Sequence, residues 1–322
     1  MIDLRYHIVS LVAVFLALGV GVLMGTTVID QTLVDGLRAR QGQYLAERDR
    51  VRAERDQLED VVGDLDRFAD EAMPYLVSGR LKGSTVVLIT TDGVGSEEWE
   101  RASRTLAMAG ATVGGVVSFQ SARLGLSATA DAQTLGELVE SNGRDVEELR
   151  TRMAERLAQE LAPERVKAAE GGGVAPGGAS GFLANLVREG FAKLELRAPS
   201  GSAPVLAPAG SLFLVMGGSE KAEIGVTASE TLVLLVRSLV GQGARVAAAE
   251  SAGSVTPYVV SVRHDGDLAA KCATVDSLGE SSGEIALVLA LEGLAAGRPG
   301  HYGYKDGAQR VLPQPQASGS PR

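Results

Sequence analysis

Apolar and polar positions divide the chain into one long apolar stretch, a charged stretch and a region of short apolar blocks. The apolar stretch, residues 8–29, holds 22 consecutive residues without a charge. As an α-helix rising 1.5 Å per residue it reaches about 33 Å, enough to cross the hydrocarbon core of a bilayer. A cleaved signal peptide, the competing interpretation, has an apolar part of only about 7–15 residues. The pattern therefore predicts an uncleaved transmembrane anchor over residues 1–29.

The charged stretch, residues 30–73, predicts a helical stalk, because it lacks proline and is rich in Arg, Glu, Asp, Gln and Leu. Apolar residues recur at seven-residue spacing, at Leu37, Tyr44, Val51, Leu58 and Leu65. The accompanying seam positions are Val34, Gln41, Arg48, Arg55 and Val62. This half-filled heptad pattern favours a coiled-coil homodimer. A single solvated helix braced by charge pairs such as Arg55 with Glu59 is the alternative. Met73 and Pro74 are expected to end the stalk.

The short apolar blocks predict an α/β domain over residues 84–307. Two strand–helix–strand units follow from the patterns at 84–91, 96–109 and 111–119, and at 211–216, 227–240 and 244–250. Each unit fits a right-handed crossover between parallel strands. The expected fold class is therefore α/β, with a transmembrane helix, a coiled-coil stalk and a Rossmann-like parallel-sheet domain.

Other segments of this region have their own patterns. Residues 145–161 predict an exposed helix, and residues 171–181 a flexible glycine-rich connector. Ser281 and Glu284 have capping-box spacing ahead of an apolar helix at 285–296. Pro, Gln, Ser and Gly dominate residues 308–322, which predicts a disordered tail.

Composition narrows the possible functions. The net charge of -9, without a Lys/Arg cluster, excludes nucleic acid as a partner. The single cysteine allows no internal disulfide. Gly93 and Gly95 follow the first strand as in a nucleotide-binding loop, but Glu98 stands where the third glycine is required. Since no catalytic elbow or paired-cysteine metal motif occurs either, the sequence predicts a protein that is not an enzyme and has no identifiable cofactor site.

Several short motifs resemble the MctB family of actinobacteria. They are LRYHIVSL at 4–11, FLALGVG at 15–21, AGATV at 109–113, ALVLAL at 286–291 and GHYG at 300–303. Their order and spacing cover most of the chain. The resemblance implies an envelope protein with a channel-like role in copper homeostasis or export. It also implies an outer-membrane location, which the sequence does not support, because the predicted strands are short, apolar and interleaved with helices.

This resemblance implies copper as a ligand, and Cu(I) prefers the soft ligands Cys, Met and His. The candidates in the soluble domain are Cys272, His264, His301 and Met216. They lie far apart in the sequence, so only folding could gather them. Cys272, within a predicted strand at 268–275, has the features of a small buried residue. We expect no tight copper site within one domain, and a weak site, if present, at a dimer interface.

Two functions are consistent with these patterns. The first is copper homeostasis or export by a single-pass protein of the cell membrane. The second is a dimeric scaffold or regulator of the cell-wall or division machinery that contacts other envelope proteins. Charge does not fix the orientation, because Arg5 precedes the span while Arg38 and Arg40 follow it. The resemblance and the short N-terminal flank favour an extracytoplasmic domain.

Overall fold

A computed structural model describes residues 4–141, 143, 145–162, 181–197, 206–218, 222–256 and 258–314. The chain forms two compact units, Met1–Leu65 and Asp66–Arg322, which we describe separately. The predicted connector, apart from Gly181, and the predicted tail from residue 315 onward lie outside the described residues.

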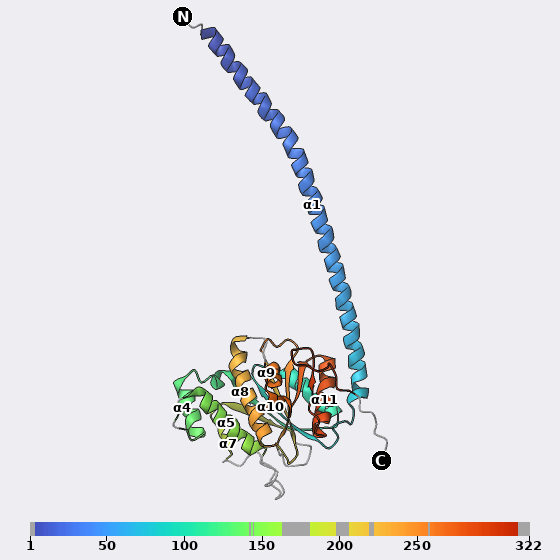
Figure 1. Ribbon diagram of the computed structural model, residues 1–322, viewed down its shortest axis with the longest axis vertical. Coiled ribbons are helices and arrows are strands. Elements are labelled where there is room, and N and C mark those ends of the chain that lie inside the picture. The colour runs from blue at the N-terminus through green and yellow to red at the C-terminus, as the bar shows by residue number, and fades with distance from the viewer. Residues whose placement is uncertain are drawn as a thin grey trace. The chain divides into compact units, whose positions relative to one another are not determined.

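Helix α1 runs from Leu4 to Val77 (Figure 1). Its residues up to Leu65 belong to the first unit, and its last turns belong to the second. Within α1, Arg5–Gly25 is apolar and long enough to span a membrane, with a mean hydropathy of 2.6. This confirms the predicted N-terminal apolar helix. Further along, exposed intrahelical ion pairs join Arg50 to Glu54 at 2.9 Å and Arg55 to Glu59 at 3.3 Å.

The helix does not end at Met73, as the sequence suggested. Pro74 lies inside α1, only three residues before its last residue, Val77. Val77 is fully buried and Met73 packs against the same apolar core of the second unit. Tertiary contacts therefore stabilise a last turn that local propensity disfavours.

The second unit is built on a seven-stranded sheet ordered β3-β2-β1-β4-β5-β6-β7. Its strands are β1 (Thr85–Thr91), β2 (Thr112–Phe119), β3 (Ala192–Leu196), β4 (Leu212–Gly217), β5 (Arg245–Ser251), β6 (Ala273–Leu278) and β7 (His301–Tyr302). All neighbouring pairs are parallel except β2 with β3, which is antiparallel. The α/β class is confirmed, but the sheet is mixed rather than wholly parallel. Strand β3, a five-residue edge strand with mostly exposed or half-exposed side chains, was not predicted from the sequence.

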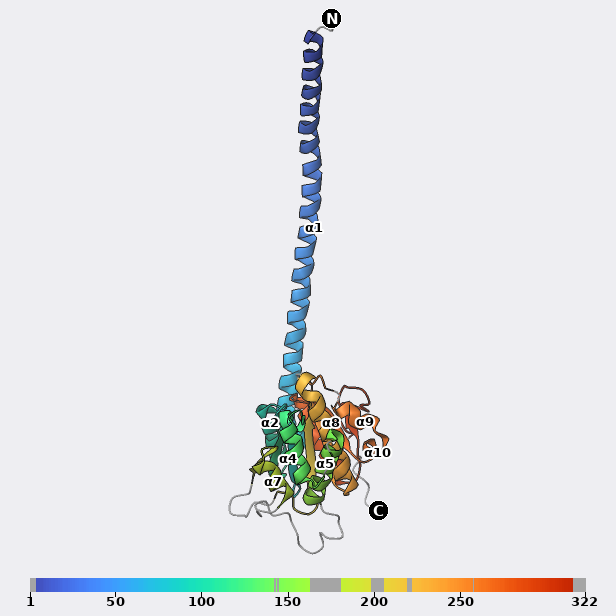
Figure 2. The same ribbon diagram turned by 90° about the vertical axis from the view of Figure 1, so that its left-hand side faces the viewer.

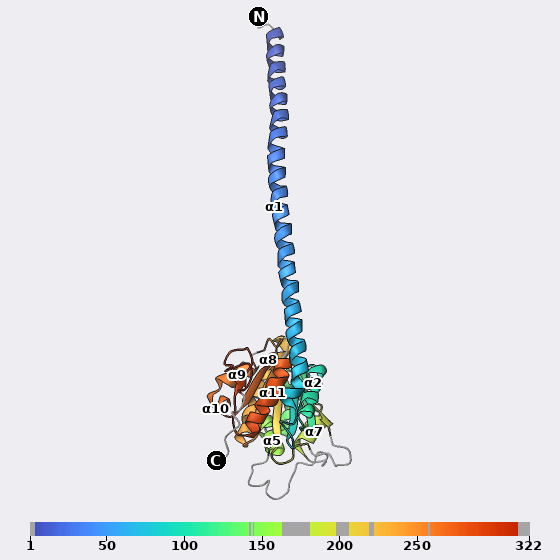
Figure 3. The ribbon, with the colours of Figure 1, turned by 90° about the vertical axis from the view of Figure 1, so that its right-hand side faces the viewer.

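Helices cover both faces of this sheet, as the three ribbon views show (Figures 1, 2 and 3). One face carries α2 (Ser96–Met108) and α11 (Ser281–Ala295). The other carries α3 (Ser121–Leu124), α4 (Thr129–Leu138), α5 (Val146–Leu161), α7 (Phe182–Arg188), α8 (Ala222–Gly241), α9 (Tyr258–His264) and α10 (Gly266–Ala269).

Successive residues of the central strands supply the two apolar cores in turn. In β1, Val87 and Ile89 face the α5 and α8 side, whereas Val86 and Leu88 face the α2 and α11 side. Since both faces are covered, these strands are apolar throughout. This explains why their sequence patterns predicted buried strands.

Helix α5 is not exposed, contrary to the sequence prediction. Leu149, Met153, Leu157 and Leu161 recur every four residues, and all are buried against the α8 side of the sheet. Acidic and basic residues occupy the remaining positions of α5, so composition alone suggested a solvated helix.

The predicted capping box at Ser281 and Glu284 is wrong. Glu280 is the N-cap residue of α11, with extended φ and ψ of -95° and 148°, so Ser281 is already helical. The Ser281 hydroxyl donates instead to Asp70 in the last turns of α1. Glu284 points into the protein and is fully buried.

Two further boundaries differ from the sequence prediction. The segment 268–275 is not one strand, because Leu268 lies in α10 and β6 begins at Ala273. Ordered structure also extends past Ala308, since Gln309 N–H donates to His301 O at 2.8 Å and Gly303 N–H donates to Arg310 O at 2.9 Å. Pairing beside β7 orders this start of the expected tail despite its composition.

Candidate functional site

The two sulfur ligands suggested by the sequence lie in different cores. Cys272 is fully buried in the core on the α8 and α9 side of the sheet. Burial raises the pKa of its thiol to about 12, so the thiol stays protonated at neutral pH, whereas a metal ligand must be a thiolate. Met216, in β4, is buried in the opposite core with α2 and α11. The sheet therefore separates Cys272 from Met216.

The two histidines use their ring nitrogens elsewhere. His301 Nδ1 lies 3.0 Å from Thr274 Oγ1, and its Nε2 lies 3.1 Å from Ala269 O. Burial, together with the nearby charge of Arg263, lowers the pKa of His301, which favours the neutral ring. His264 is exposed, and its Nε2 lies 3.1 Å from Asp306 Oδ2.

Folding does not bring these four residues into one ligand set. Among the residues that the structure describes, no group of three or more His, Cys, Asp or Glu side chains is placed to hold a metal ion. A closed Cu(I) site needs soft donors close together. In the described part of the domain, two of these donors are therefore buried in opposite cores and the two imidazoles have polar partners, so the four stay separate.

A buried ion pair joins helix α9 to Asp276, which lies within β6, two residues before the last residue of that strand. Arg263 Nη1 of α9 and Asp276 Oδ2 of β6 are 2.6 Å apart, and their side chains are 1% and 0% exposed. Arg263 also donates from Nε to Thr274 Oγ1 at 2.8 Å and from Nη2 to Tyr302 O at 2.8 Å. Asp276 accepts from the backbone N–H of Lys305 at 3.0 Å.

A second ion pair extends this network. Lys305 Nζ donates to Glu250 Oε1 at 2.8 Å and to Ser254 O at 2.9 Å. Glu250 Oε2 accepts from Val259 N–H at 3.2 Å. Burial raises the pKa of Glu250, an effect that Lys305 partly offsets. These groups have partners within the protein, so the network holds the C-terminal segment against the sheet instead of presenting free ligands.

Glycine permits this close approach. Gly303 has φ of 129°, and a Cβ at this position would lie 1.9 Å from Asp276 Oδ1. The GHYG motif at 300–303 is visible in the sequence, but the ion pairs are not. The pair of Arg263 with Asp276 spans 13 residues and that of Glu250 with Lys305 spans 55, so no local pattern reveals them.

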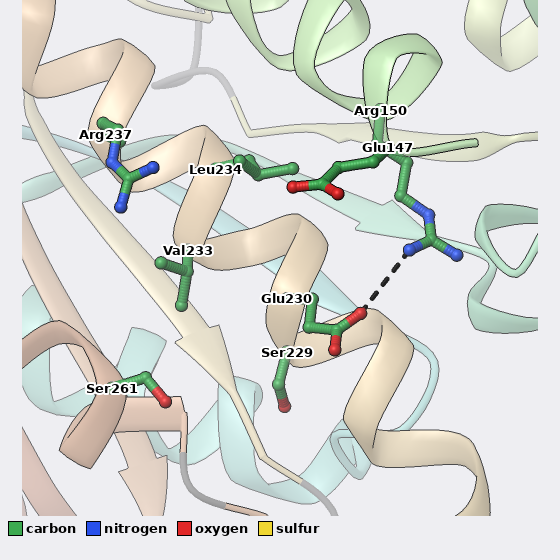
Figure 4. A pocket seen from close by; sticks show the side chains of 8 residues that line it. All are labelled: Glu147, Arg150, Ser229, Glu230, Val233, Leu234, Arg237 and Ser261. Carbon is green, nitrogen blue, oxygen red and sulfur yellow. Dashed lines mark ion pairs between the residues drawn. The ribbon is translucent and has the colours of Figure 1, made fainter. Parts of the chain in front are cut away.

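A groove of about 450 Å³ lies between α5, α8 and α9 (Figure 4). Arg150 of α5 points across it toward Glu230 of α8, with Nη1 3.5 Å from Oε2. Arg150 is also held by Leu124 O, which accepts from its Nε at 2.9 Å. The remaining lining residues are Glu147, Ser229, Val233, Leu234, Arg237 and Ser261. Since the lining contains no thiol, thioether or imidazole, this groove does not suit Cu(I).

Glu284 is an isolated acid in the core beside α2. Its side chain is fully buried, and neither carboxyl oxygen makes a hydrogen bond of ordinary geometry. Burial raises its pKa to about 7, although Thr105, the backbone of Gly279 and the charges of Arg101 and Arg104 partly oppose the shift. A buried carboxyl without a full set of partners favours the neutral form. Glu284 therefore titrates near neutral pH, within the interface between α11 and α2.

These features define a class: an α/β domain carried by a helix that includes one apolar segment of membrane-spanning length. The chain belongs to the family described as copper transport outer membrane protein, MctB, whose family model matches residues 1–313. The copper transporter MctB of Mycobacterium tuberculosis (strain H37Rv) is 29% identical over 334 residues, covering 97% of this chain and 99% of the relative. The copper transporter MctB of Mycobacterium leprae is 26% identical over 327 residues, covering 98% and 100%.

Proposed function

We propose that this protein is a membrane-anchored envelope protein that takes part in copper transport and is not an enzyme. The observation that carries this proposal is the family match over residues 1–313, with relatives called copper transporters aligned along nearly their whole length. Because the similarity includes both the apolar helix and the α/β domain, the whole architecture supports the proposal rather than one shared motif.

The geometry favours a transport role without tight copper storage in one domain. Cys272 is a buried, protonated thiol, and Met216 lies in the other core. His301 and His264 have partners within the protein. Any contact between copper and these four residues is therefore weak or depends on a second copy of the chain, in which each ligand is present twice.

The anchor and domain are proposed to form a single-pass protein with its domain on the extracytoplasmic side and its stalk paired in a homodimer. The family match supports this orientation. A single span forms no pore by itself, so a channel would need further copies or partners. The order β3-β2-β1-β4-β5-β6 supports a doubly wound, Rossmann-like assignment in which β3 is reversed.

A deletion strain tests the copper role. We expect greater copper sensitivity and higher cell-associated copper than in the parent, both restored by the full-length chain. Zinc sensitivity, measured in parallel, controls for general envelope damage and should not change. A strain with normal copper tolerance but defective septation would refute the proposal and support the alternative, a scaffold for the cell-wall or division machinery.

A further inference from the structure

We propose that one face of the lower part of α1 is the docking surface for a second copy of this chain. We call this face the lower seam, formed by Leu58, Val61, Leu65, Phe68, Ala72 and Tyr75. The inference rests on the homodimer in the proposed function and locates its interface. The partner helix lies parallel to α1.

The lower seam has the spacing of a coiled-coil core. Its residues follow one another at intervals of three, four, three, four and three, which are the alternating steps between a and d positions of a heptad. The large members of the seam are exposed, with Phe68 at 70% and Tyr75 at 89%. Single exposed apolar residues are ordinary, but a continuous apolar stripe marks an interaction surface.

The α/β domain leaves the large residues of this stripe exposed, while Ala72 is half-buried. Met73 and Val77 lie four residues apart on the helix face that packs against the domain core. Tyr75 is two residues from each, which places it about 200° around the helix from both. Phe68 shares the face of Tyr75, because seven residues make about two turns. A second helix can therefore reach Phe68 and Tyr75 without displacing the domain.

The stripe ends at Leu58 on its N-terminal side. Continuing the same spacing puts Glu54, Glu47 and Arg40 where Val61, Phe68 and Tyr75 stand. Glu54 is paired within its own helix, to Arg50. Charged residues at these positions weaken a coiled-coil core. The seam is therefore shorter than the stalk, and its second set of positions differs from the set that heptad spacing first suggested.

A second copy is the partner that this surface fits. Two chains anchored through the same apolar segment start at the same membrane depth, which makes their helices parallel and sets equal residues opposite each other. The stripe is then apolar against apolar throughout. The flanking e positions are Val62, Ala69 and Leu76, and the acidic g positions are Asp64 and Glu71. In a parallel pair the g positions of one copy face the e positions of the other, so these two acids meet no like charge there.

Cysteine cross-linking in the membrane-embedded, full-length protein tests this surface. Cys272 is the only native cysteine and is changed to Ala in all variants. Val61→Cys and Phe68→Cys each place a thiol at the seam, and Asp60→Cys places one on the outer face as a control. We expect mild oxidation with diamide to yield at least tenfold more dimer from the seam variants than from Asp60→Cys. Equal yields, or cross-links to a different protein, would overturn the proposal.

Light scattering in detergent gives a second, independent measurement. Phe68→Glu puts a charge in the seam at an exposed position, so the domain should keep its fold, as circular dichroism can verify. We expect a monomer for Phe68→Glu and a dimer for Asp60→Arg and the wild type. A wild-type monomer, or a dimer for Phe68→Glu, would overturn the docking surface. Copper tolerance is scored separately, because its loss or retention bears on the transport role and not on the interface.

Discussion

Replacing Glu284 with Gln should change how the stability of the domain depends on pH. Glu284 is fully buried on α11 beside α2, and its pKa is raised by burial from 4.5 to about 7. The change to Gln keeps the size of the side chain and removes the charge. Any unpartnered amide left behind costs the same free energy at every pH, so it does not alter the pH dependence.

The sign follows from the two pKa values. Below pH 4.5 the carboxyl is protonated in both the folded and the unfolded protein, so it opposes neither state. As the pH rises from 4.5 toward 7, the unfolded state loses its proton first and the free energy of unfolding falls. Above pH 7 the loss is complete. A rise in the pKa from 4.5 to about 7, at 1.36 kcal/mol for each pH unit, corresponds to a loss of about 3 kcal/mol.

Urea unfolding of the full-length protein at several pH values between 4 and 8.5 measures this effect. Trp99, the only tryptophan, lies on α2 and packs against the core that contains α11, so its fluorescence reports on this interface. Relative to wild type, Glu284→Gln should gain about 3 kcal/mol between the acidic and the alkaline end of the series.

The matched control is Glu280→Gln, an exposed carboxyl four residues earlier. It should follow the wild-type pH profile closely. If Glu284→Gln also runs parallel to wild type at every pH, the carboxyl is not desolvated in solution and the reasoning fails.

Three further predictions concern the buried network, copper and topology. Arg263→Met leaves Asp276 charged and without its ion-pair partner in the core and should cost about 3–5 kcal/mol in urea unfolding. Arg188→Met, which breaks an exposed pair, should cost less than about 1 kcal/mol, and equal losses would show that the network is not buried in solution. In competition with a Cu(I) chelator, the wild type and Cys272→Ala should both fail to retain stoichiometric copper; retention that disappears in Cys272→Ala would make this thiol the functional ligand. Reporter fusions after Pro313 should be active only outside the cytoplasm, and cytoplasmic activity would reverse the proposed topology.

The features that sequence predicted are those set by local composition. The apolar helix followed from an uncharged run whose length matches a bilayer. Strands β1 and β4 followed from apolar runs without polar interruption, because both of their faces are covered. The C-terminal ends of α2 and α11 were predicted to within about two residues, since glycine follows soon after each helix.

Tertiary structure decided the features that depend on partners distant in the chain. Edge strand β3 is defined by pairing with β2, not by its own short sequence. Glu284 had the spacing of a capping-box residue. The helix starts one residue earlier than that spacing requires, with Glu280 as its N-cap, and Glu284 lies on the buried face of α11. The same holds for the candidate ligands: Cys272 had the features of a small buried residue, but only the sheet determines that Cys272 and Met216 face opposite cores. Periodicity describes which side of an element is apolar, whereas the identity of the group across from it depends on how distant segments pack.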